Sequence, residues 1–218
     1  MNLDWGWIQR NLDLIGDLTL QHTLLAIVPV LLALVVSIPL GYLVHRTGHG
    51  ANSLLAVLGL IYSIPSLALF VAMPILLGTQ ILDPLNIAVA LAIYSVALLV
   101  RSVVDGFRSV PSEVKQSAAA VGYGTFRRVL GVELPLAMPV IFAGLRVVTV
   151  SNIALVSVAV VVGQGALGTL FERGFRSTFY TPIIVGLVLS LVLALLADAL
   201  ILLIRRGTLP WARGRRTA

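Results

Sequence analysis

Residues 112–139, SEVKQSAAAVGYGTFRRVLGVELPLAMP, form the only long charged interval inside the hydrophobic body of this chain. The interval carries ionisable side chains at Glu113, Lys115, Arg127, Arg128 and Glu133. An ion placed near the centre of a membrane helix costs roughly 2.5–3.5 kcal/mol. We therefore expect the interval to lie in water on one side of a membrane, because strongly apolar segments precede and follow it.

The pattern within this interval predicts two short helices. A first helix over 112–121 is expected to have Ser112 at its N-cap and good helix formers in its body. Gly122-Tyr123-Gly124 then ends it, since glycine readily takes the positive φ that closes a helix. A second helix over 125–130 is expected to stop before Pro135, whose ring disfavours helical geometry in the preceding residue.

The composition sets the class of protein. Hydrophobic residues make up 59% of the 218 residues and charged residues 11%, which excludes an ordinary soluble domain. There is no cysteine, so neither a disulfide framework nor a thiolate metal site is possible. The chain is expected to be an all-α integral membrane protein.

Five apolar stretches reach the roughly twenty residues that a membrane span needs. They cover about 23–44, 54–77, 85–104, 136–162 and 182–204. The second stretch contains Pro65 and Pro74, so an unwound middle is expected there. We expect an extracytoplasmic interfacial segment over 1–21 with Trp5 and Trp7 at headgroup depth, a transmembrane domain over 22–204 with a loop at 105–135, and a basic tail over 205–218.

The charged interval resembles the signature loop of ATP-binding-cassette (ABC) importer membrane subunits. That pattern is Glu-Ala-Ala, three residues, Gly, nine residues, Ile-x-Leu-Pro, and the spacing here matches throughout. The chain departs from it with Gln116 for Glu, Ser117 for Ala and Val132 for Ile. The resemblance implies a type I importer permease fold with a cytoplasmic coupling helix that docks on a separate ATPase. The implied coupling residues are Glu113, Gln116, Ser117, Ala118, Gly122, Arg127, Arg128, Leu134 and Pro135.

Further stretches resemble the permeases for glycine betaine, carnitine and choline. They are YSIPSLAL at 62–69, VELPLAMPVI at 132–141 with AGLR at 143–146, and the glycine run at 163–168. The resemblance implies an osmoprotectant importer in a bacterial cytoplasmic membrane. It also implies a second permease subunit, identical or homologous, two copies of the ATPase and an extracytoplasmic substrate-binding protein.

The chain lacks the motif that holds nucleotide phosphates. It contains no G-x-x-x-x-G-K-[ST] sequence, and Lys115 is its only lysine. The resemblance places ATP and Mg on the partner ATPase, so this chain is expected to be neither an enzyme nor a cofactor-binding protein. Gly163, Gly165 and Gly168 formally fit a dinucleotide motif, but no βαβ pattern surrounds them. The resemblance assigns them instead to a turn near an outer gate; a flexible outer connection is the plainer alternative.

Basic residues predict the orientation. If the signature loop is cytoplasmic, eleven arginines and lysines fall on that side and three on the other, so the N-terminus lies outside and the C-terminus inside. The eleven are Arg46, Arg101, Arg108, Lys115, Arg127, Arg128, Arg205, Arg206, Arg213, Arg215 and Arg216; the three are Arg10, Arg173 and Arg176. The net charge of +6 then reflects contact with anionic lipid headgroups rather than nucleic-acid binding.

Polar groups inside the apolar stretches are candidates for a translocation path. They include Ser63, Ser66, Tyr94, Ser151 and Asn152, with Ser95, Thr149 and Ser157 as further members. The alternative is that these side chains only join neighbouring helices. Arg146 and Asp198 lie at depths that differ by about one helical turn, so we expect them to pair with each other or with backbone carbonyls.

Two other classes of function remain as alternatives. A stand-alone secondary transporter would need its own coupling-ion site and usually an internal repeat. A membrane enzyme would need convergent catalytic groups, whereas His22, His45 and His49 form no ligand set and the apolar stretches hold no paired carboxylates. Within the preferred class, an importer for another small cationic or zwitterionic compound stays open.

Overall fold

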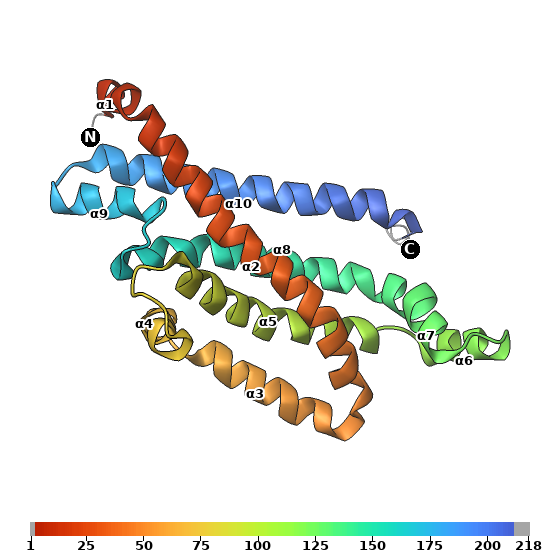
Figure 1. Ribbon diagram of the computed structural model, residues 1–218. Helices are drawn as coiled ribbons and strands as arrows, with labels where there is room; N and C mark the ends of the chain where they lie inside the picture. Colours follow the sequence, from red (N-terminus) through yellow and green to blue (C-terminus); the bar gives the residue numbers. More distant parts are fainter. Residues whose placement is uncertain (1–2, 212–218) are drawn as a thin grey trace.

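The computed structural model describes residues 3–211 and consists of helices and connecting loops over that range (Figure 1). The helices are α1 (Trp5–Arg10), α2 (Leu12–Arg46), α3 (Ala51–Ser63), α4 (Ser66–Leu77), α5 (Pro84–Arg108), α6 (Ser112–Ala120), α7 (Thr125–Arg128), α8 (Leu134–Val158), α9 (Gly168–Arg176) and α10 (Tyr180–Thr208). A π-helical segment, Val129–Glu133, joins α7 to α8, and 3-10 turns occupy Gly48–Gly50 and Ala159–Val162. The expected all-helical membrane fold is confirmed.

Helices α2, α5 and α8 form the centre of the bundle, and α2 crosses the other two obliquely (Figure 1). The packing is close at Gly41 of α2, where a Cβ atom would lie 2.5 Å from Cγ1 of Val103 in α5. Leu99, Phe107 and Ile141 are almost fully buried in the same region. Close packing of small and branched side chains is what holds helices together where lipid replaces water.

The remaining helices lie around this centre. Helices α3 and α4 pack on α5, whereas α10 packs on α8 and α9. Large apolar side chains such as Val35 of α2 and Leu195 of α10 remain about 70% exposed, as expected for surfaces that face lipid or another membrane helix. Helix α6 projects from one end of the bundle, which is also where α10 ends, and α1 and α9 lie at the other end (Figure 1).

Within residues 3–211, four helical segments are long and apolar enough to cross a membrane, and the bent pair α3–α4 makes a fifth crossing if it counts as one span. The pair bends by 95° at Ile64-Pro65, which bears out the expected interruption of the second span. Proline forces the preceding residue out of the helical region, and Ile64 accordingly has φ −62° and ψ 131°.

Two expected helix boundaries were wrong. Helix α2 begins at Leu12, so residues 12–22 belong to the first long helix and only the short α1 stands apart from it. The second helix of the charged interval does not stop before Pro135, because Thr125–Val162 is one apolar helical segment of 38 residues. Pro135 lies just after the π-helical turn Val129–Glu133, which lets the helix continue past a residue that has no N–H.

Candidate functional site

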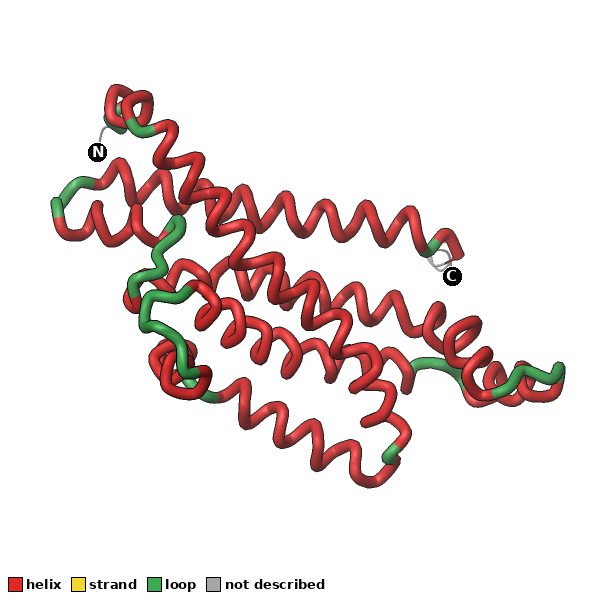
Figure 2. Tube along the Cα trace, viewed as in Figure 1, coloured by secondary structure: helices red, strands yellow, loops and turns green. Residues whose placement is uncertain are grey.

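The charged interval forms a segment that protrudes from the bundle. Figure 2 shows one loop before α6 and another between α6 and α7. On α6, the side chains of Glu113, Gln116 and Ser117 are exposed, while Ala118 is buried. Ser112 is the first helical residue rather than the expected N-cap, a position that Pro111 takes, and its hydroxyl donates to Glu113 at 3.2 Å. The projecting segment thus presents a small polar face beside an apolar tip at Val121 and Phe126, both more than 75% exposed.

A glycine ends α6. Gly122 has φ +85°, and the amides of Gly122 and Tyr123 donate to the carbonyls of Ala119 and Ala118 at 3.0 Å. This arrangement satisfies two of the carbonyls that a helix end leaves free. The turn therefore fixes the angle between α6 and α7, and a side chain at residue 122 would strain it.

A buried ion pair fixes the junction between the projecting segment and the bundle. Nε of Arg128 donates to Oε1 of Glu133 at 2.8 Å, and Glu133 is only 3% exposed. Lys115 adds a bond at 3.4 Å from Nζ to the carbonyl of Phe107 at the end of α5. Leu134 and Pro135 follow directly and begin α8. A displacement of α7 is therefore transmitted to α8 without an intervening flexible loop.

Several of the candidate path residues meet at the break between α3 and α4. Ser63 ends α3, Ser66 begins α4, and the hydroxyl of Tyr94 in α5 donates to the carbonyl of Ile64 at 2.5 Å. The ring of Tyr62 contacts that of Tyr94 edge-on, with centroids 5.6 Å apart. Tyr94 thus satisfies a carbonyl that the break removes from the helix, which stabilises the bend.

Asn152 lies apart from this cluster, in a buried polar contact between α2, α5 and α8. Its amide nitrogen donates to Oγ of Ser95 at 2.9 Å and lies 3.4 Å from the carbonyl of Ala26. His22 of α2 is also fully buried, with Nε2 2.9 Å from the carbonyl of Ile153. These contacts favour a helix-joining role for Asn152, while its neighbour Ser151 is half-buried.

Arg146 of α8 and Asp198 of α10 form a two-bond ion pair. Nε of Arg146 donates to Oδ1 at 2.5 Å and Nη2 donates to Oδ2 at 2.8 Å. The two side chains remain 35% and 25% exposed. The sequence left open whether these two residues pair with each other or with backbone carbonyls. The structure shows that they pair with each other.

The glycine run lies at the end of the bundle opposite α6. Gly163 has φ +82°, Gly165 lies in the following loop, and Gly168 begins α9 with the carbonyl of Ser157 too close to admit a side chain. Gln164 Nε2 donates to the carbonyl of Leu82, which joins this turn to the loop after α4. The turn, α4 and that loop thus meet at one end, away from the residues predicted to couple to the ATPase.

The contacts of three residues of the site were not predicted from the sequence. Glu133 occupies the unspecified position of the signature, so nothing in the pattern indicates its burial. His22 is the first residue of the predicted transmembrane domain, and Ser95, a further candidate for the path, is one of several hydroxyls in the spans. The partners of His22 and Ser95 lie on other helices, so only a prediction of which helices cross could have found these contacts. The contact of Glu133 with Arg128 depends on how the helix is rotated.

Long apolar helices, one broken span and a short helix that projects from one end of the bundle are the features of an integral membrane protein. The chain belongs to the family described as "binding-protein-dependent transport system inner membrane component", which it matches over residues 33–209. Membership of this family implies that a binding protein and an ATPase work with it.

Curated relatives cover most of the chain. It is 34% identical over 194 residues to the osmoprotectant import permease protein OsmW of Salmonella typhimurium, covering 88% of this chain and 90% of the relative. It is 32% identical to the glycine betaine/carnitine/choline transport system permease protein OpuCD of Bacillus subtilis, covering 87% and 82%. The choline transport system permease protein OpuBB of that organism is also 32% identical, with 88% and 87% covered.

Solved structures support the fold. A chain of the MetNI methionine ABC transporter in an inward-facing conformation superposes with a TM-score of 0.77 at 21% identity, covering 86% of this chain and 93% of that one. A second crystal form of that transporter gives a TM-score of 0.74 at 18% identity, with 90% and 97% covered. The type I importer permease fold expected from the signature loop is therefore confirmed.

Proposed function

We propose that this chain forms the translocation path of an ABC importer for a compatible solute such as glycine betaine, carnitine or choline. The observation that carries the solute class is that three relatives, at 32–34% identity over nearly nine-tenths of the chain, are osmoprotectant or choline permeases. An importer for another small cationic or zwitterionic compound is the second candidate, since the path residues are uncharged hydroxyls and amides.

The proposal includes the orientation and the partners. The end that carries α6 faces the cytoplasm and the end that carries α1 and α9 faces outward, because the basic residues gather at the α6 end. Arg213, Arg215 and Arg216 of the basic tail contribute to that count but lie outside the described residues. Two ATPase copies, which bind ATP and Mg, dock on the α6 ends of this chain and of a second permease subunit, identical or homologous. A binding protein delivers the solute on the opposite side.

The continuous segment Thr125–Val162 supports a lever mechanism. At 1.5 Å per residue, its 38 residues extend for about 57 Å, from the coupling turn at Gly122 to the outer turn at Gly163. ATP-driven closure of the ATPases would move α6, and the buried Arg128–Glu133 pair would carry that movement into α8. The outer end of α8 would shift at the same time, which couples the two sides of the membrane.

The path is proposed to run along the break between α3 and α4. Non-helical backbone at membrane depth is stable only where protein or a water-filled cavity surrounds it. Ser63, Ser66 and Tyr94 lie at this break, and Ser151 is the remaining half-buried candidate on α8. Asn152 would support the path indirectly, by fixing α8 against α2 and α5.

Uptake by the reconstituted complex tests the function. Vesicles would contain this chain with its ATPase, a docked binding protein and radiolabelled glycine betaine, with or without internal ATP. We expect accumulation that requires ATP and that an ATPase variant lacking its phosphate-binding lysine abolishes. Carnitine and choline in parallel vesicles would rank the solutes.

The outcomes separate the two candidates. If an assembled complex hydrolyses ATP but accumulates none of the three compounds, the solute class is wrong and the importer assignment stands. Accumulation that is independent of ATP and collapses with the ion gradient would instead identify a secondary transporter.

A further inference from the structure

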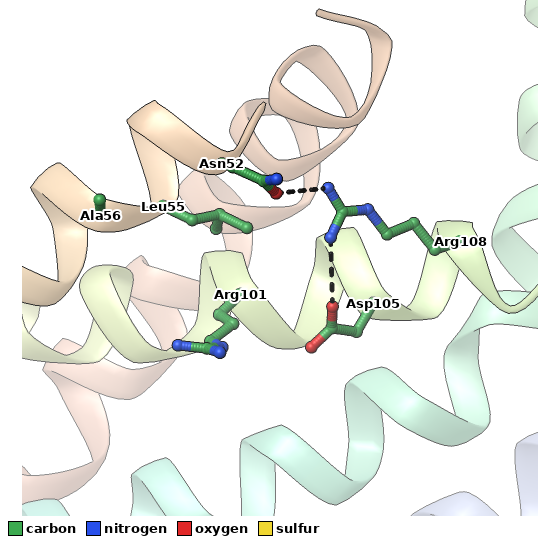
Figure 3. A pocket seen from close by; sticks show the side chains of 6 residues that line it. All are labelled: Asn52, Leu55, Ala56, Arg101, Asp105 and Arg108. Atoms are coloured by element: carbon green, nitrogen blue, oxygen red, sulfur yellow. Dashed lines mark hydrogen bonds and ion pairs between the residues drawn. The ribbon is translucent and has the colours of Figure 1, made fainter. Parts of the chain in front are cut away.

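An open pocket of about 270 Å³ lies between the first turns of α3 and the last turns of α5, at the α6 end of the bundle. Its lining comprises Asn52, Leu55, Ala56, Arg101, Asp105 and Arg108 (Figure 3). It is separate from the projecting α6–α7 segment and from the break at Ile64-Pro65. Neither the coupling role nor the proposed path makes use of its charges.

The charges of the pocket do not balance. Arg101, Asp105 and Arg108 have the spacing of residues on one helical face, so two guanidinium groups flank one carboxylate. Arg108 lies 3.9 Å from Oδ1 of Asp105 and donates to Oδ1 of Asn52 at 3.3 Å (Figure 3). Within residues 3–211, Arg101 has neither a hydrogen bond nor an ion pair. The pocket therefore carries a net positive charge and free guanidinium donors.

The pocket lies near one end of the membrane-spanning helix α5, where the headgroup layer of a bilayer is expected. Arg101 precedes the end of α5 by seven residues, which is about 10 Å along the helix. The polar layer on each side of a bilayer is roughly 5–8 Å thick. With the end of α5 at the membrane surface, the pocket would span this layer and the outermost hydrocarbon. Leu55 and Ala56 supply an apolar wall beside the arginines, where an acyl chain would begin.

We infer that this pocket binds a phosphate group, and that the group is the phosphodiester of an anionic phospholipid. Arginine matches phosphate oxygens through two parallel N–H donors, and Asn52 adds an amide donor, since its oxygen already accepts from Arg108. The lipid supplies both chemistries present in the pocket, an anion for Arg101 and Arg108 and a chain for the apolar wall. Free inorganic phosphate would use only the first.

A single reporter cysteine provides the test, because the chain has no cysteine of its own. Ala56→Cys would be labelled with a small fluorophore in the complex of this chain with its ATPase, placed in nanodiscs. Phosphatidylglycerol or phosphatidylcholine, each with a nitroxide near the glycerol end of its chain, would serve as quencher. We expect phosphatidylglycerol to quench at a several-fold lower mole fraction than phosphatidylcholine.

Arginine variants localise the effect. Arg101→Gln and Arg108→Gln should each reduce the preference for phosphatidylglycerol by about fivefold, the effect typical of one basic residue near an anionic surface. Arg101→Lys should retain part of it, because the charge remains without the paired donors. Arg205→Gln, which removes a charge near the same end of the bundle on α10, is the matched control and should leave the preference unchanged.

Each outcome is decisive. The inference is overturned if Arg205→Gln lowers the preference as much as Arg101→Gln, since the effect would then be general surface charge. It is also overturned if Arg101→Gln prevents assembly with the ATPase while Arg101→Lys restores it, since the pocket would then hold a partner's carboxylate. Inorganic phosphate that abolishes the preference at millimolar concentration would keep the phosphate site but assign it to free phosphate. None of these results depends on which solute is transported.

Discussion

The three-helix centre and the projecting segment of α6 and α7, which we propose couples to the ATPase and call the coupling segment, are built by opposite means. In the centre, α2, α5 and α8 approach closely at Gly41, and nearly every side chain between them is buried. In the coupling segment, most side chains of α6 and α7 are exposed, and a glycine turn and one buried ion pair fix its position. The centre thus determines stability, whereas the coupling segment can change its contacts without unfolding the bundle. Substitutions in the two regions should separate these roles.

The largest effect is expected in the centre. Gly41→Leu would force a side chain into the space of Val103, where even a Cβ atom would lie 2.5 Å from Cγ1. Overpacking of this kind costs up to about 3 kcal/mol, so the variant should unfold at markedly lower denaturant in mixed micelles. Gly16→Leu is the matched control on the same helix, because nothing lies within 4 Å of its Cβ position. Equal losses in both variants would contradict close packing at Gly41.

The second effect concerns the junction. Arg128→Gln leaves the carboxylate of Glu133 buried without its ionic partner. Loss of one member of a fully buried pair costs 3–5 kcal/mol, and because Arg128 is 28% exposed we expect about 2 kcal/mol. The adjacent Arg127→Gln removes only a contact with the ring of Tyr123 and should cost about 0.5 kcal/mol. Chemical denaturation of both variants measures the difference, and a null difference would show that the junction does not depend on this pair.

The third effect should appear in transport and leave stability intact. Gly122→Val places a branched side chain at φ +85°, a strain of about 1–2 kcal/mol that α6 can relieve by leaving its docked orientation. That energy corresponds to a reduction in coupled uptake on the order of tenfold. Gly124→Val is the control, since Gly124 has φ −63° and ψ 160°, which any residue adopts. Full uptake by Gly122→Val at normal membrane levels would rule out a fixed turn as part of the coupling.

The sequence predicted the class and the coupling turn because each depends on local chemistry. Long apolar stretches indicate spans, Pro65 indicates a break, and Gly122 indicates a positive φ. Helix boundaries that depend on tertiary context were predicted less well. Pro135 indicated the end of a helix, yet the π-helical turn at Val129–Glu133 lets the chain continue into α8.

Contacts between helices could be predicted only where charge limits the choice. Arg146 and Asp198 are the two ions within the fourth and fifth expected spans, so their depths indicated a pair. His22 and Ser95 had no such restriction, because any carbonyl or amide at similar depth could have satisfied them. Their partners depend on the rotation and crossing of α2, α5 and α8, which an apolar pattern does not specify.

The smallest effect tests how α10 is attached to the centre. Asp198→Asn or Arg146→Gln alone would leave one ion at membrane depth without its partner, so each should lower the melting temperature. The double variant removes both ions, and its loss should be smaller than the sum of the single losses, which a double-mutant cycle measures directly. We expect modest changes, because apolar contacts with α8 and α9 also hold α10. Strict additivity would show that the two ions contribute independently, and the pair would then not be what attaches α10 to α8.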